Sequence, residues 1–135
     1  MLERTLAIIK PDAVRKKIYG NIISIIESNK VEVEEMKLIL LSTETAKKFY
    51  AIHKEKSFYN DLVKFMTSGK VVVMILKGED VINKWRTMMG ATDPAKAEVN
   101  SIRYRYADSI QNNCVHGSDS VESSEYEISV LFSKK

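Results

Sequence analysis

Apolar residues along the chain fall first into strand-like runs. Residues 4–9 form a β-rich run that ends at Pro11, where the ring removes a backbone donor. The run from Val71 to Leu76 is continuously apolar, which is typical of a strand buried on both faces. Residues 31–41 alternate with one slip of phase, and a β-bulge near Glu34-Glu35 would restore the register. These patterns predict three strands.

Between the strands, apolar residues recur at the spacing of a helix. Gly69 and Gly90 are the expected stops of the third and fourth helices, because glycine accepts the conformation that ends a helix. The polar stretch 91–113 is irregular, and so long a loop in a compact domain is usually functional or disordered. We expect it to form a folded lid or wall of a site. Helices are predicted to open at Gly20-Asn21, at Ser42 or Thr43, at Ser57 and at Glu79.

One histidine, His116, stands out after the short apolar step Cys114-Val115. Asp119 and Glu122 have the spacing of a capping box, so a last helix is predicted to begin directly after it. The N-terminus of that helix would favour negative charge, and an imidazole beside an anion suits phosphoryl transfer. Glu127, about two turns into the helix, is placed to fix the tautomer of the ring. The apolar stripe of this helix is expected to comprise Val121, Ser124, Ile128, Leu131 and Phe132.

Length and composition are those of one ordinary globular domain, residues 1–135, with 44% hydrophobic and 29% charged residues. The net charge of +3 is mild and indicates at most a local attraction for anions. Cys114 is the single cysteine, which excludes an intrachain disulfide and fits a reducing compartment. No apolar run has the length of a membrane span, and the N-terminus lacks a signal-peptide pattern. We expect a cytoplasmic protein that does not insert into membranes.

Two separated motifs resemble the nucleoside diphosphate kinase family. One is Asn-x-x-His-Gly-Ser-Asp-Ser at residues 113–120, and the other is Glu-Arg-Thr-Leu-Ala-Ile-Ile-Lys-Pro-Asp-Ala-Val at residues 3–14. The resemblance extends from Glu3 to Phe132 in the order and spacing of the family. Periodicity alone supports only an α/β or α+β sandwich. The resemblance implies a ferredoxin-like βαββαβ α+β sandwich with a four-stranded antiparallel sheet, an extra helical hairpin and a long loop before the last strand.

The resemblance also implies an activity: transfer of the terminal phosphoryl group from a nucleoside triphosphate, mainly ATP, to nucleoside diphosphates. His116 is implied to carry the phosphoryl group as a phosphohistidine in a ping-pong reaction. Magnesium would arrive on the nucleotide phosphates, and members of the family form homotetramers or homohexamers. The residues implied to contact the phosphates are His53, Arg86, Thr92 and Arg103.

The remaining residues of the implied site surround the sugar, the base and the histidine. Lys10 and Asn113 correspond to contacts with the sugar hydroxyls, and Lys10 also serves the transferred phosphoryl group. Stacking on a base tolerates any base, so we expect broad base specificity. The base walls would be Phe58 and Ile110, the pocket edge Leu62, and the groups around the imidazole Tyr50, Ser118 and Glu127.

The residues alone are also compatible with other functions. The chain has neither a complete P-loop nor a Gly-x-Gly-x-x-Gly motif, so side chains and a helix end must hold the phosphates. A nucleic-acid-binding or regulatory module on the same fold is one alternative, although the chain lacks an aromatic RNA-binding motif and a long basic stripe. A phosphohistidine relay to proteins is another. The chain departs from the family at Asn100-Ser101, where Gly-Thr is usual, and asparagine tolerates the left-handed backbone that glycine would provide.

Overall fold

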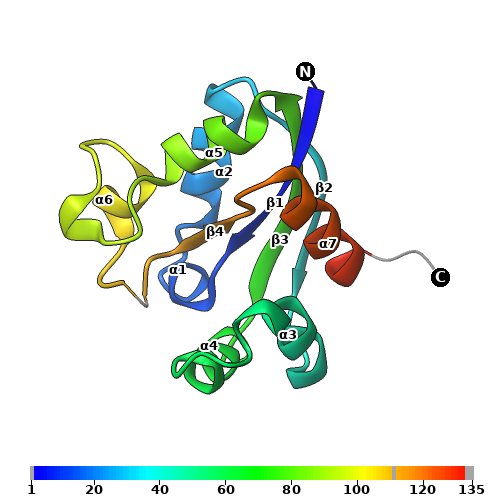
Figure 1. Cartoon of the computed structure of the whole chain (residues 1–135). Coiled ribbons are helices and arrows are strands. Elements are labelled where there is room, and N and C mark those ends of the chain that lie inside the picture. The colour runs from blue at the N-terminus through cyan, green and yellow to red at the C-terminus, as the bar shows by residue number, and fades with distance from the viewer. Residues whose placement is uncertain (1, 111, 133–135) are drawn as a thin grey trace.

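The computed structural model describes residues 2–110 and 112–132 and is built around one four-stranded sheet. The strand order is β2-β3-β1-β4, and each neighbouring pair is antiparallel (Figure 1). The predicted α+β fold with an antiparallel four-stranded sheet is therefore confirmed. The strands are β1 (Leu2–Ile9), β2 (Glu32–Ile39), β3 (Val71–Glu79) and β4 (Val115–Gly117).

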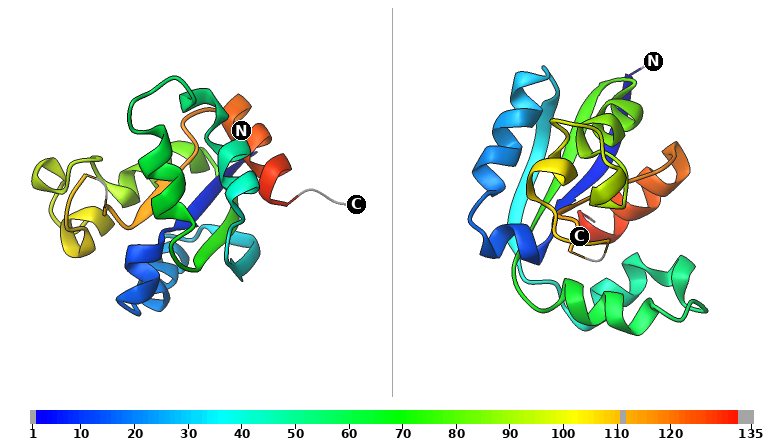
Figure 2. Two further views of the ribbon diagram at one scale, coloured as in Figure 1. Left: turned by 90° about the horizontal axis from the view of Figure 1, so that it is seen from below. Right: turned by 90° about the vertical axis from the view of Figure 1, so that its left-hand side faces the viewer.

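Helices cover both faces of the sheet. Helices α2 and α7 lie on opposite sides of it, and α3 and α4 form a helical hairpin at the end of the sheet where β2 stops and β3 starts (Figures 1 and 2). Within the described residues, no helix has the length and apolar character needed to cross a membrane. The helices are α1 (Pro11–Arg15), α2 (Tyr19–Ser28), α3 (Thr43–Phe49), α4 (Tyr59–Met66), α5 (Val81–Met89), α6 (Ile102–Tyr106) and α7 (Val121–Leu131), with single 3₁₀ turns η1 (Ala51–His53) and η2 (Pro94–Lys96).

Alternation along the central strands divides the core into two layers. On β1, Ala7 and Ile9 join one cluster with the apolar faces of α2 and α5, while Leu6 and Ile8 join the other with α3, α4 and α7. All four side chains are fully buried. The central position of β1 and β3, which the continuous apolar runs predicted, follows from this burial on both faces.

Strand register places the histidine on the edge strand β4, opposite the C-terminal part of β1. His116 is the middle residue of β4 and pairs with Ile8 on β1. The apolar step before it predicts a histidine at the end of a strand, but β4 continues to Gly117. Gly117 pairs with Ala7. On the far side of the sheet, the register shifts between Val33 and Glu35, which confirms the predicted β-bulge.

Several predicted helix ends are wrong. Glu79 belongs to β3, and Asp80 turns with a φ of 52° before α5 begins, because the strand continues beyond its apolar run. Ser57 is not a cap: α4 begins two residues later, after Phe58. Gly69 is not its stop either, since Thr67 closes the helix by donating its hydroxyl to the Val63 carbonyl. Ser42 caps the start of α3 and Gly90 ends α5, as predicted.

Two short helices were not predicted. Pro11 opens α1 because proline is well suited to the first position of a helix, although in the sequence it indicated only the end of a strand. In the long stretch before β4, Ser101 caps α6 by accepting from the Tyr104 N–H. Asn100, directly before that cap, has a φ of 73°, which confirms that this asparagine adopts the left-handed conformation.

The start of α7 differs in detail from its prediction. Ser120, not Asp119, is the cap: its hydroxyl accepts from the Ser123 N–H at 3.1 Å, whereas Asp119 accepts from the Ser123 hydroxyl. Both residue types can cap, so the pattern alone did not separate them. Val121 is exposed rather than part of the buried stripe, while Ser124 and Leu131 are buried.

Candidate functional site

A cavity of about 550 Å³ lies where the ends of β1 and β4 meet α5 and the stretch that contains α6. Its lining includes nine of the side chains predicted for the site, which come from segments distributed over the whole chain. It does not include the first turn of α7, so the expected contribution of that helix end to anion binding finds no support. The nine are Lys10, Tyr50, His53, Leu62, Arg86, Thr92, Arg103, Asn113 and His116.

His116 is held from its ring and from its backbone. Its Nε2 lies 2.9 Å from Glu127 Oε1, and the Ser118 hydroxyl donates to the same carboxylate oxygen at 2.9 Å. Ser118 is itself fixed, because its hydroxyl accepts from the Leu6 N–H of β1 at 3.2 Å. These hydrogen bonds, from β1 through Ser118 to Glu127, orient the imidazole, a role that the sequence predicted for Glu127. The opposite ring nitrogen, Nδ1, has no such partner among the described residues.

Two buried aromatic side chains also contact the histidine. Trp85 of α5 donates its indole N–H to the His116 carbonyl at 3.0 Å. Phe49 packs edge-on against the imidazole with ring centroids 5.1 Å apart. A Cβ on Gly117 would lie 2.5 Å from Trp85 Cδ1, so the glycine serves this close approach rather than a positive φ. The helical spacing of Trp85 and Phe49 predicts that both are buried, but it does not predict that they contact His116.

Arg103 of α6 is buried and connects three parts of the backbone. Its Nη1 donates to the Gly90 carbonyl at 2.9 Å, its Nε to the Asn113 carbonyl at 3.3 Å and its Nη2 to the Val115 carbonyl at 2.8 Å. Burial, followed by the positive charge of Arg86, lowers its pKa. The guanidinium therefore brings a fixed positive charge to the cavity and also fastens α5 to the segment before His116.

Lys10 and Asn113 form a second polar pair in the cavity wall. Lys10 Nζ donates to Asn113 Oδ1 at 2.9 Å, and Asn113 Nδ2 donates to the Thr92 carbonyl at 3.4 Å. Lys10 is largely buried at the end of β1. Burial, followed by the charge of Arg103, lowers the pKa of Lys10 to about 8. The lysine therefore carries its charge at neutral pH and loses it in mildly alkaline solution.

Tyr50 closes the cavity beside the histidine. Its ring lies 6.5 Å from the imidazole, and its hydroxyl is buried without a hydrogen-bond partner among the described residues. Burial, followed by the nearby Glu127 carboxylate, raises the pKa of Tyr50, so the phenol stays protonated. The cavity thus offers an unused hydroxyl next to the ring.

The two residues predicted to sandwich a base lie outside the cavity lining. Phe58 is half exposed and packs its ring 5.5 Å from that of His53, which does line the cavity. Ile110 is 61% exposed in the stretch before β4, and no described contact brings it to the site. Phe58 is therefore connected to the site through His53, whereas the position of Ile110 as a wall remains a prediction.

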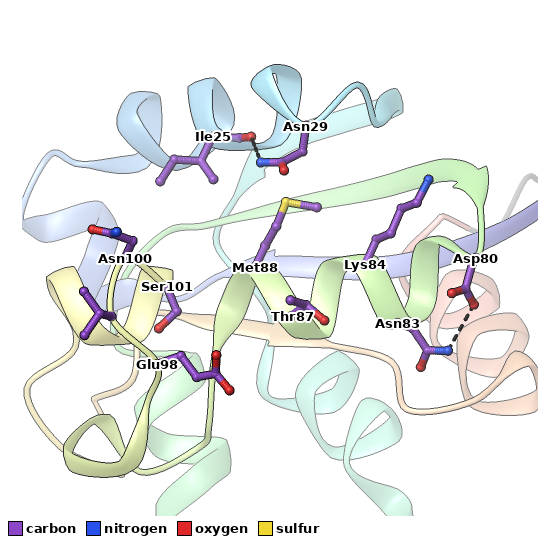
Figure 3. A pocket seen from close by; sticks show the side chains of 11 residues that line it. Ile25, Asn29, Asp80, Asn83, Lys84, Thr87, Met88, Glu98, Asn100 and Ser101 are labelled. Carbon is purple, nitrogen blue, oxygen red and sulfur yellow. Dashed lines mark hydrogen bonds between the residues drawn. The ribbon is translucent and has the colours of Figure 1, made fainter.

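Two further features bear on what the site can bind. Across the described ranges 2–110 and 112–132, His, Cys, Asp and Glu side chains form no cluster able to hold a metal ion. A separate pocket of about 520 Å³ lies between α2, α5 and the loop before α6 (Figure 3). It contains none of the predicted site residues, and Asn29 and Asn83 bond to neighbours on their own segments. The predicted site residues therefore gather at the cavity around His116 and not at this second pocket.

Comparisons with known proteins give one family. A family model described as nucleoside diphosphate kinase matches residues 3–135. The nucleoside diphosphate kinase of Helicobacter pylori is 53% identical over 135 residues, covering 100% of this chain and 98% of that protein. That of a Nitratiruptor species is 52% identical over 134 residues, covering 99% and 98%.

Solved structures give the same result for the fold. The crystal structure of the Aquifex aeolicus nucleoside diphosphate kinase superposes with a TM-score of 0.96 at 40% identity and covers 98% of this chain and 96% of its own. That of the Encephalitozoon cuniculi enzyme superposes with a TM-score of 0.94 at 32% identity and covers 98% and 90%. The similarity therefore includes the sheet, the helical hairpin and the long stretch before β4.

Proposed function

Because this chain belongs to the nucleoside diphosphate kinase family, we propose that His116 is the group that carries the phosphoryl between its two substrates. The chain transfers a phosphoryl group from a nucleoside triphosphate to a nucleoside diphosphate. In the first half-reaction an imidazole nitrogen attacks the terminal phosphorus, and the bond to the leaving diphosphate oxygen breaks. In the second, a diphosphate oxygen attacks the phosphohistidine, and the ring nitrogen leaves. The single observation that carries this proposal is the imidazole, oriented by Glu127, in a cavity lined with cations.

The hydrogen bond to Glu127 selects the reacting nitrogen. Glu127 accepts the proton of Nε2, so Nδ1 is left with a free lone pair. We therefore infer that Nδ1 forms the bond to phosphorus. As positive charge develops on the ring, the Glu127 carboxylate stabilises it, and Ser118 keeps that carboxylate in place.

Charge stabilisation and positioning supply most of the catalysis in phosphoryl transfer. We assign phosphate contacts to Arg86, Arg103, His53 and Thr92, which line the cavity together with His116. Each opposite charge at 4 Å contributes about 4 kcal/mol at an effective dielectric near 20. Tyr50 offers its free hydroxyl beside the ring, and Leu62 forms the cavity edge.

Sugar and base occupy the outer part of the site in this proposal. Lys10 and Asn113, already hydrogen-bonded to each other, would meet the sugar hydroxyls, while Lys10 also faces the transferred phosphoryl group. Phe58 and Ile110 are both exposed apolar side chains and would sandwich the base. Stacking is worth about 1–3 kcal/mol and does not read the base edge, so donors with any base should react.

Members of the family use a divalent metal with the nucleotide. We propose that the metal is Mg²⁺ and that the nucleotide phosphates hold it, since hard oxygen donors are its preferred ligands. Lys10 and the arginines would then bind the remaining phosphate charge. We also propose that the protein works in the cytoplasm, where the buried free thiol of Cys114 stays reduced.

The experiment that tests this function uses γ-labelled triphosphates in two steps. We expect ATP, GTP, CTP and UTP each to leave an acid-labile, base-stable label on the protein, and GDP to remove it as GTP. Label from ATP alone would overturn broad donor use. Label that never leaves with GDP would favour relay to a protein. Tight, salt-sensitive oligonucleotide binding without label would favour the nucleic-acid module, which the family and its named relatives do not favour.

Glu127→Gln should slow phosphorylation of His116 by roughly 10- to 100-fold. The amide is nearly the same size but neutral, and it can present either a donor or an acceptor to Nε2, so the ring tautomer is no longer fixed. Single-turnover labelling measures the rate, and Ser118→Ala is the matched control. It removes only the hydroxyl that holds the carboxylate, so it should slow labelling less. Equal rates in wild type and Glu127→Gln would contradict this role.

We further propose that the chain forms a homo-oligomer, a tetramer or a hexamer. Strand β2 is an edge of the sheet, and it exposes the apolar side chains of Met36 and Leu38, with exposed Leu40 directly after it. An exposed apolar edge strand in a soluble monomer invites association. Light scattering of the purified chain would give its mass, and a monomeric mass at micromolar concentration would contradict the proposal.

A further inference from the structure

A left-handed residue lies between the proposed sugar contact and the histidine strand. Cys114 has a φ of 72°, an uncommon conformation for a residue that is not glycine. Both polar groups of its backbone are held from the start of the chain. The Lys10 N–H donates to the Cys114 carbonyl at 2.7 Å, and the Cys114 N–H donates to Asp12 Oδ2 at 3.1 Å.

Asp12 is an unusual residue for such a bond. Its side chain is 95% buried, and its second oxygen, Oδ1, has no hydrogen-bond partner among the described residues. Burying a carboxylate is costly unless its charge and oxygens are used. Helix α1 explains little of this, because it has only five residues and no side-chain cap. The one backbone contact of this carboxylate described here is the turn at Cys114.

We infer that Asp12 is a positioning residue for the nucleotide: its buried carboxylate clamps the left-handed turn at Cys114 and thereby fixes Asn113 against Lys10. This inference rests on the proposed role of Lys10 and Asn113 in nucleotide binding. The turn at Cys114 connects the proposed sugar contact to the proposed nucleophile, since Asn113 precedes it and the strand with His116 follows it. Without the clamp, the strain of the positive φ favours another backbone conformation, and the Asn113 side chain moves away from Lys10.

The charge of Asp12 has a second effect, on Lys10. Burial and Arg103 lower the pKa of Lys10 to about 8, and Asp12 acts against both by raising it. Burial, followed by Asp12, raises the pKa of the Cys114 thiol to about 12, so Cys114 is neutral near pH 8 and does not offset this. The titratable and charged groups around Lys10 are Asp12 on α1, Arg103 on α6, Cys114 before β4, and the cavity residues Tyr50, His53, Arg86 and His116.

Deprotonation of Lys10 should limit activity on the alkaline side. In the wild type, Lys10 loses its proton as pH rises through about 8, so kcat/KM should fall on the alkaline side from there. Asp12→Asn removes the charge that favours the protonated lysine, while its amide oxygen can still accept from the Cys114 N–H. The alkaline limb of this variant should therefore move to lower pH by about one unit.

The clamp is tested by a double-mutant cycle. Asp12→Ala removes the acceptor and should lower kcat/KM by about 10- to 100-fold, because small displacements of binding groups are costly. Glycine adopts a positive φ without a steric cost, so Cys114→Gly makes the turn independent of the clamp. Asp12→Ala should therefore cost at least about fivefold less in the Cys114→Gly background than in the wild type. An equal loss in both backgrounds would overturn the clamp.

A second measurement needs no turnover. Carbon-13 NMR of the lysine Cε should show Lys10 titrating at lower pH in Asp12→Asn than in the wild type, and the side-chain amide signal of Asn113 should shift in Asp12→Ala. An unmoved Asn113 amide in folded Asp12→Ala would overturn the clamp. If Asp12→Ala folded poorly, the Lys10 titration in Asp12→Asn would still be measurable, and an unmoved titration there would overturn the effect of Asp12 on Lys10. Wild-type protein that forms no phosphohistidine, but shows both shifts, would instead count against the proposed function alone.

Discussion

His116→Ala is expected to abolish phosphoryl transfer, with a loss of about 10⁴-fold or more in kcat and no acid-labile label from ATP. The imidazole is the bond-forming group, and within the described residues no other nucleophile shares its orientation by Glu127. The cations that bind the phosphates remain, so nucleotide affinity should change little. Single-turnover labelling measures the first effect, and fluorescence competition for a bound nucleotide measures the second.

His53→Ala is the matched control, because the chain contains only these two histidines. His53 lines the same cavity, but among residues 2–110 and 112–132 no carboxylate bonds to it as Glu127 bonds to His116. We expect its alanine variant to keep the label and to bind triphosphate more weakly. Label retained in His116→Ala and lost in His53→Ala would reassign the nucleophile.

Periodicity predicted the elements whose burial is simple. The run from Val71 to Leu76 is apolar at every position and is the central strand β3, and the slip near Glu34 is a bulge. Periodicity did not predict the order of the strands in the sheet. Which strands pair depends on contacts between distant residues, such as Ile8 with His116, and only the resemblance to a known family supplied it.

Ambiguity in residue chemistry explains the local errors. Asp119 and Ser120 are both good caps, and only the geometry of the chain after His116 selects the serine. Pro11 ends a strand and begins a helix with the same rigid φ. In each case the preference of the residue type was interpreted correctly, but the sequence was compatible with two local structures.

The sequence predicted the chemical groups of the site but not the hydrogen bonds that hold them in place. Positive charges at Lys10 and Arg103 were visible in the sequence. That Arg103 also holds three backbone carbonyls, and that Asp12 holds Cys114, depends on where the chain folds back on itself. Phe49 and Trp85 show the same limit, because their spacing identified a buried face but not the histidine that they contact.

Arg103→Ala is the second large effect that we expect, and it should change two quantities at once. Loss of the fixed charge at the phosphate should lower kcat/KM by roughly 10²- to 10³-fold, or about 3–4 kcal/mol of transition-state stabilisation. The carbonyls of Gly90, Asn113 and Val115 also each lose a donor, so the free energy of unfolding should fall by about 2 kcal/mol or more. Steady-state kinetics and denaturant unfolding measure the two effects separately.

Arg103→Lys separates charge from framework. A lysine keeps the positive charge, but one ammonium on a flexible stem cannot replace a planar fork that reaches Gly90, Asn113 and Val115 together. It should therefore recover part of the activity and little of the stability. Because Asn113 is held through its carbonyl by Arg103 and through its side chain by Lys10, loosening the first contact should also raise the KM for the nucleotide. Unchanged turnover in Arg103→Ala would remove Arg103 from the reaction, and full recovery of stability by lysine would show that the carbonyl contacts contribute little.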